Sequence, residues 1–162
     1  MPKSNPSLIE ALHAAADRLD SGAKYEWGHM ARCNCGHLLQ SLTGLDDREI
    51  SSAVDHRLDE WTEHAKTFCP QSGRAVDEVF EILESFGFLR EDVIHLENLS
   101  DRQVLSRLGD NVHLQRNNRD DLVLYLRTMA DLLSEKIDAE AAARAEEALL
   151  TSPMLMAGLM RR

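Results

Sequence analysis

Residues 25–42 read YEWGHMARCNCGHLLQSL, and this stretch holds two of the three cysteines of the 162-residue chain. Its apolar residues recur at the spacing of one helical face. Gly28 and Gly36 oppose a helix, because each costs about 1 kcal/mol relative to alanine. The sequence therefore leaves two conformations open, a continuous helix or a helix that is broken close to Cys33 and Gly36.

A continuous helix would place His29, Cys33 and His37 in one row, because residues four apart differ by about 40° around the axis. Thiolate and imidazole groups are ligands of transition metals, so this row would be half of a metal site. His56, on the helix that follows, would be its neighbour. Cys35 would then point to the opposite side, into the core.

A broken helix would instead let Cys33 and Cys35 converge on one metal centre, which needs further ligands. Cys69 is the remaining cysteine, and His29 or His37 would complete the set. Soft thiolates select zinc or an iron–sulfur cluster. Two straight antiparallel helices would keep Cys69 about 20 Å from Cys35, so this set needs the break or a bend. The predicted ligands are Cys33, Cys35, Cys69, His29 and His37.

The same stretch resembles the start of the NlpC/P60 cysteine peptidases, which carry Tyr-x-Trp-Gly followed by Asp-Cys-Ser-Gly-Leu. Residues 25–28, YEWG, match the first motif, and residues 34–38, NCGHL, align with the second with Asn for Asp and Gly-His for Ser-Gly. The resemblance implies a cysteine-dependent enzyme with Cys35 as nucleophile, and His64 or His113 would serve as base. It also implies a small β-sheet, which the sequence after residue 43 does not predict.

The rest of the chain is a succession of amphipathic helical patterns separated by helix-stop residues. No stretch alternates apolar and polar residues as a half-buried strand does. The sequence therefore predicts an all-α bundle of five or more mostly antiparallel helices, with residues 1–150 as a single domain. The predicted core includes Trp27, Leu38, Leu58, Trp61, Phe80 and Leu126.

Several helix starts are predicted from capping signals. Three pairs have the spacing of a capping box, in which two side chains satisfy each other's backbone N–H groups. These pairs are Ser7 with Glu10, Asp46 with Glu49, and Ser100 with Gln103. A last long helix is predicted from about Asn118, and its second half is rich in Ala and Glu and therefore expected to be exposed.

The composition limits the classes of partner. A formal net charge of -10 argues against nucleic acid, which needs a basic surface. No apolar run approaches the ~20 residues that span a bilayer, and the N-terminus lacks the apolar segment of a signal peptide. These features predict a cytoplasmic protein, a setting in which clustered cysteines bind metal or catalyse more often than they form disulfides.

The last residues, 151–162, are predicted to form a flexible apolar tail, because Pro153 interrupts the helix before it. The tail and the last helix could contact a protein partner or a second copy of the chain. Three functions thus follow from the sequence: a metal- or iron–sulfur-binding helical protein, a cysteine-dependent enzyme, and an interaction module without site chemistry.

Overall fold

The computed structural model describes residues 1–27, 29, 31–51, 77–109 and 111–150. Every regular element in this part of the chain is a helix, which confirms the predicted all-α class. The helices are α1 (Pro6–Asp20), α2 (Asn34–Thr43), α4 (Asp77–Ser85), α5 (Arg90–Asn98), α6 (Arg102–Leu108) and α7 (Arg119–Leu150). A further helical run covers residues 47–51.

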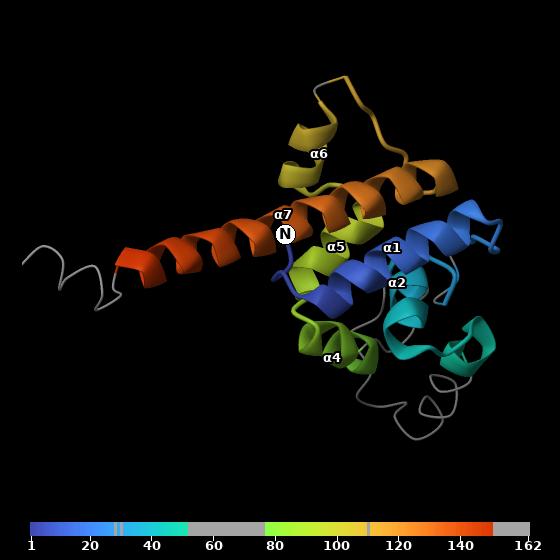
Figure 1. Ribbon diagram of the computed structural model, residues 1–162. Coiled ribbons are helices and arrows are strands. Elements are labelled where there is room, and N and C mark those ends of the chain that lie inside the picture. The colour runs from blue at the N-terminus through green and yellow to red at the C-terminus, as the bar shows by residue number, and fades with distance from the viewer. Residues whose placement is uncertain (28, 30, 52–76, 110, 151–162) are drawn as a thin grey trace, which may run out of the picture.

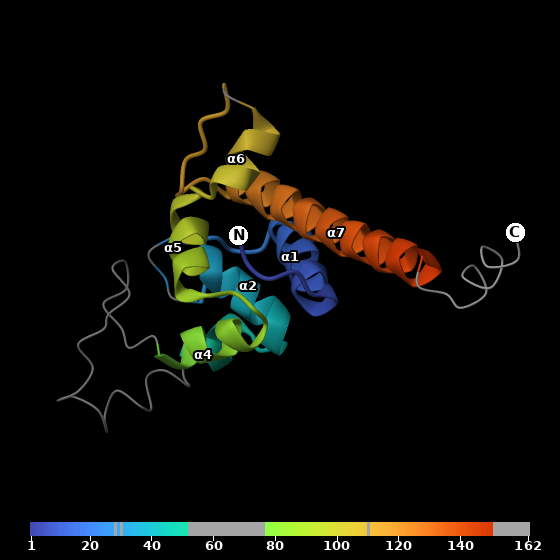
Figure 2. The ribbon, with the colours of Figure 1, turned by 90° about the vertical axis from the view of Figure 1, so that its left-hand side faces the viewer.

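Helix α1 lies at the centre of the bundle, between α7 on one side and α2 on the other (Figures 1 and 2). Helices α1 and α7 pack antiparallel, and α2 also contacts α4 and α5. The apolar stripe of α1 is fully buried because large side chains recur every three or four residues and meet those of α7. Completely buried side chains of the two helices include Leu8, Leu12, Leu19, Leu122, Leu126 and Met129.

Of the predicted core residues, Leu38 and Leu126 are completely buried and Trp27 is half-buried. The indole ring of Trp27 lies beneath the Arg116 guanidinium, whose central carbon is 4.5 Å from the ring centroid. This contact leaves the ring at the edge of the core. The side chain of Phe80 and the whole of Leu58 and Trp61 lie outside the described part of the chain.

Two predicted capping signals are confirmed. Asp46 and Glu49 form a reciprocal capping box: the Asp46 N–H donates to Glu49 Oε2 at 2.8 Å, and the Glu49 N–H donates to Asp46 Oδ1 at 2.8 Å. The side chain of Asn118 caps α7 by accepting from the N–H groups of Asp120 and Asp121, at 2.9 and 3.2 Å. Both caps satisfy donors that a helix start leaves unpaired.

The prediction that Ser7 caps the first helix was wrong, since α1 begins at Pro6 and Asn5 is its N-cap. Asn5 Oδ1 accepts from the Leu8 N–H at 2.9 Å. Proline suits the first helical position, where its missing N–H is not needed and its fixed φ is already helical. Pro6 therefore moves the helix start upstream of Ser7.

The prediction that Ser100 caps a helix was also wrong, because the N-cap of α6 is Asp101. Ser100 instead completes the end of α5: its N–H donates to the His95 carbonyl at 2.9 Å after Leu99 has entered the left-handed region with φ 49°. Asp101 Oδ1 then accepts from the N–H groups of Gln103 and Val104, at 2.8 and 3.3 Å. The close succession of two helices thus shifts the cap by one residue.

Replacing Asp101 with alanine is expected to lower the free energy of unfolding by about 2–3 kcal/mol. The change removes a helix cap and a charge-assisted contact, because Asp101 Oδ2 also lies 2.7 Å from the buried amino group of Met1. Urea unfolding of the variant would measure the loss. Asp120→Ala, an exposed acidic residue in the first turn of α7, is the control and should change stability by less than about 0.5 kcal/mol. Equal losses in both variants would contradict the expectation.

The second half of α7 extends beyond the other helices (Figure 2). Residues 138–150 are exposed throughout, as the Ala- and Glu-rich sequence predicts, and Leu149 and Leu150 are among them. These two side chains suggest a contact face on this helix, while the predicted tail 151–162 lies outside the described residues. None of the described helices is both long enough and apolar enough to cross a membrane.

Candidate metal centre

The stretch 25–42 is not a continuous helix. Among the described residues, Trp27, Ala31 and Arg32 lie in turns, Cys33 has an extended backbone with φ -75° and ψ -176°, and α2 begins only at Asn34. Local bonds favour this break: the Glu26 N–H donates to the Arg32 carbonyl at 3.1 Å, a direction opposite to that of helical bonds, and His29 Nδ1 accepts from the Ala31 N–H at 3.3 Å. The helical row of His29, Cys33 and His37 therefore does not form.

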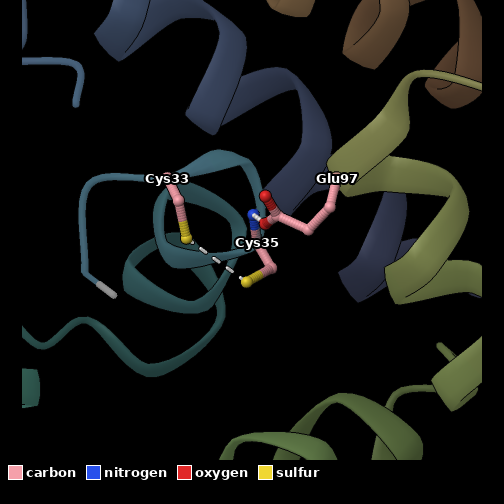
Figure 3. A group of neighbouring side chains, drawn as sticks. All are labelled: Cys33, Cys35 and Glu97. Atoms are coloured by element: carbon pink, nitrogen blue, oxygen red, sulfur yellow. Dashed lines mark hydrogen bonds between the residues drawn. The ribbon is translucent and has the colours of Figure 1, made fainter. Parts of the chain in front are cut away.

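The break brings the two cysteines together. Cys33 Sγ and Cys35 Sγ are 3.5 Å apart, and the carboxylate of Glu97 from α5 joins them (Figure 3). One ligand atom from each of the three residues lies within 4.8 Å of the other two. The side chains are buried, with exposed fractions of 3, 8 and 5% for Cys33, Cys35 and Glu97. These residues form a candidate metal-binding group.

Glu97 also caps α2 from outside. Cys33 occupies the N-cap position without a side-chain cap bond, and Glu97 Oε1 accepts from the Cys35 N–H at 2.7 Å. A carboxylate is stabilised there because a helix N-terminus carries unpaired N–H groups and a partial positive charge. The second oxygen, Oε2, is buried and has no hydrogen-bond partner among the described residues. That oxygen is therefore available to a ligand.

Asn34 links the start of α2 to the end of α5. Its completely buried amide donates from Nδ2 to the carbonyl oxygens of Leu96 and Glu97, at 3.0 and 3.3 Å, and its Oδ1 accepts from Tyr25 Oη at 2.8 Å. The last carbonyls of a helix need such donors. The C-terminal turn of α5 is thereby fastened against the N-terminus of α2, so that Glu97 faces Cys35.

The Cys33–Cys35–Glu97 group brings three ionisable side chains together in the protein interior. The pKa of Cys35 is raised well above its ordinary value, first by the Cys33 thiol, then by burial and by the Glu97 charge. Burial also raises the pKa of Glu97. Each shift means that negative charge is costly here, so a bound cation would replace protons and stabilise the charged ligands.

The separation of the two thiols is compatible with a shared metal ion. Two sulfurs on a tetrahedral zinc ion, each at about 2.3 Å, are about 3.7 Å apart, close to the separation in this protein. A disulfide would need about 2.05 Å. The Glu97 carboxylate would supply an oxygen ligand of a kind that zinc accepts. The donor set therefore fits a thiolate-preferring metal ion.

Among the described residues, neither His29 nor His37 belongs to this group of ligand atoms. The side chain of His29 accepts from a backbone N–H in the turn before α2. His37 is 2% exposed, stacks on Tyr25 with ring centroids 6.2 Å apart, and has its Nδ1 3.3 Å from Arg18 Nη2. Cys69 and His56 lie outside the described part of the chain.

Sequence reasoning missed Glu97, which lies in a stretch whose apolar pattern is irregular. One signal was present in the sequence: an acidic residue in the last turn of a helix opposes the helix dipole and is unfavourable unless something compensates. The compensation comes from another helix, since the N-terminus of α2 faces this carboxylate. A local pattern alone does not contain that pairing.

The likeness to cysteine peptidases extends only to the position of Cys35 at the start of a helix. The described residues form no strand, the candidate base His113 is exposed, and no described histidine belongs to the Cys33–Cys35–Glu97 group. His64 lies outside the described residues. No protein-family model, curated protein or solved structure proved similar to this chain.

Proposed function

We propose that this protein binds one metal ion of the zinc class through Cys33, Cys35 and Glu97, and that the ion fastens the start of α2 to the end of α5. The observation that carries the proposal is the convergence of three buried acidic side chains from two elements, with ligand atoms within 4.8 Å of one another. A carboxylate is rarely fully buried without a partner that balances its charge, and Glu97 is 5% exposed.

The ligand types favour a single ion over a cluster. Two thiolates select zinc and related soft metals, and a carboxylate completes many zinc sites. Iron–sulfur clusters are held mainly by four cysteines, whereas this chain contains three. Cys69 stays a sequence-based prediction for a fourth ligand, with a bound water as the alternative that would leave a position open for chemistry.

Elemental analysis of the purified chain tests the proposal, and substitution with cobalt(II) shows thiolate ligation by its charge-transfer absorption. We expect one metal ion per chain in the wild type. Cys33→Ser, Cys35→Ser and Glu97→Gln should each weaken binding by about 100-fold or more, since changes to mere supporting residues already cost about 10–100-fold. Glu97→Gln is informative because the amide oxygen can still accept from the Cys35 N–H.

Glu91→Gln is the matched control, because Glu91 lies on the same helix with its side chain 85% exposed. Its metal affinity should equal that of the wild type. Cys69→Ser decides the fourth ligand: a loss as large as that of Cys35→Ser would include Cys69 in the site. Metal binding that survives unchanged in Cys33→Ser, Cys35→Ser and Glu97→Gln would refute the proposal.

A further inference from the structure

We propose that Cys33 and Cys35 are a redox switch of this site: a peroxide oxidises the pair to a disulfide, and the metal ion leaves. The release rests on the proposed metal-binding function, whereas the disulfide step depends on the thiol pair alone. The observation behind it is the 3.5 Å separation of two thiols that are one residue apart at a helix start.

Closing the disulfide requires little movement. The two sulfurs must approach by about 1.5 Å to reach bonding distance. Cys33 precedes the first turn of α2 in an extended conformation and makes no side-chain cap bond, because Glu97 supplies the cap instead. Turning the Cys33 side chain toward Cys35 would leave the Glu97 cap of α2 in place.

The position of each thiol assigns its role. Cys33 lies at the N-cap of a ten-residue helix, in extended chain before the first turn, and is the thiol that the oxidant attacks first in this proposal. Cys35 lies next to it and is placed to resolve the first oxidation product. The side chains of Cys33 and Cys35 are 3 and 8% exposed, so the oxidant has to be small. A peroxide meets this requirement, whereas a bulky disulfide such as oxidised glutathione does not.

The chemistry balances with hydrogen peroxide as the oxidant. The Cys33 thiolate attacks one peroxide oxygen, the O–O bond breaks, and the departing hydroxide takes a proton to become water, which leaves Cys33 as a sulfenic acid. The Cys35 sulfur then attacks the Cys33 sulfur, and the hydroxyl group leaves with the Cys35 proton as a second water. Two thiols and one peroxide yield one disulfide and two waters.

Oxidation removes the two soft ligands from the metal. Disulfide sulfur carries no negative charge, so Glu97 would be the one anionic ligand left in the group. A metal bound by thiolates should therefore be released in step with disulfide formation. A dithiol reductant would restore the ligands, because a disulfide is reversible whereas the higher oxidation products of cysteine are not.

The Cys69→Ser variant tests the disulfide step, since Cys33 and Cys35 are then the two cysteines of the chain. After removal of metal with a chelator and addition of hydrogen peroxide, both thiols should disappear and the intact mass should fall by two hydrogen atoms. Dithiothreitol should restore both. Cys33→Ser in the same background is the control, because its single thiol cannot form an intramolecular bond. Gain of oxygen atoms instead, or covalent dimers, would overturn the proposal.

The wild type provides a second reading that does not depend on how the variant folds. Trypsin releases residues 33–48 as one peptide that carries both thiols, and Cys69 in a different peptide. A disulfide within the first peptide supports the switch, and a link between the two peptides overturns it. In the zinc-loaded wild type, peroxide should release one zinc per disulfide to a colour-forming chelator. A chain that forms the disulfide but never binds metal would refute the proposed function and leave the redox pair standing.

Discussion

Chelation of the proposed metal ion is expected to lower the free energy of unfolding by about 4 kcal/mol, if the metal was present at about 1,000 times its dissociation constant. For a chain of this size, that loss corresponds to a fall in melting temperature of about 8–16 °C. The reason is that the three ligands converge only in the folded chain. An ion held by these residues would therefore bind the native state and stabilise it against the unfolded one.

Thermal unfolding followed by circular dichroism, with zinc or with excess chelator, measures this effect. Cys35→Ser should show nearly the same melting temperature under both conditions, because its metal affinity is lost. Glu91→Gln should respond like the wild type, since its carboxylate lies on the exposed side of α5. If chelation shifts the wild type and Cys35→Ser equally, the metal acts elsewhere on the chain and the proposed centre is wrong.

Acidification from about pH 6.5 to pH 4 is expected to cost the metal-free protein about 3 kcal/mol of stability through His37 alone. Burial, and after it the neighbouring Arg18 charge, lower the pKa of His37 from 6.5 to about 4. The unfolded chain therefore takes up a proton on this residue at a higher pH than the folded chain. The contribution of His37 to stability is fully present above pH 6.5. It falls as the pH drops toward 4 and changes no further below that pH.

Urea unfolding across this pH range, in the presence of a chelator, isolates the contribution of His37 from that of the metal. His37→Gln should flatten the curve, because glutamine does not titrate. His113→Gln, at an exposed position in the connection before α7, is the control and should keep the wild-type dependence. Parallel curves for the wild type and His37→Gln would show that the imidazole does not cause the acid loss.

Most of the helical architecture followed from local sequence. The periodic apolar stripes of α1 and α7 predicted both their existence and their buried faces. Gly44 ends α2 in the left-handed region at φ 72°, which glycine adopts without strain. The capping predictions succeeded at Asp46 and Asn118 and missed by one or two residues at Asn5 and Asp101. Such errors arise because neighbouring polar residues compete for the same N–H groups.

The periodicity of the apolar residues did not by itself predict the break before α2. The apolar pattern of residues 25–42 is compatible with a helix throughout, and two glycines oppose it by about 1 kcal/mol each. The decision came from contacts across the fold: the buried Asn34 amide bonds to the end of α5, and Tyr25 Oη lies 2.8 Å from the Arg116 carbonyl oxygen. These partners are remote in sequence, so a local reading left both conformations open.

The two cysteines of the candidate centre were evident from the sequence, because they are one residue apart and any break near them brings the thiols together. Glu97 was not, since 62 positions separate it from Cys35. Its carboxylate reaches the thiols because α5 packs with its C-terminal turn against the N-terminus of α2. Residue spacing determines which groups can share one turn of chain, whereas the packing of helices determines which buried charge completes a site.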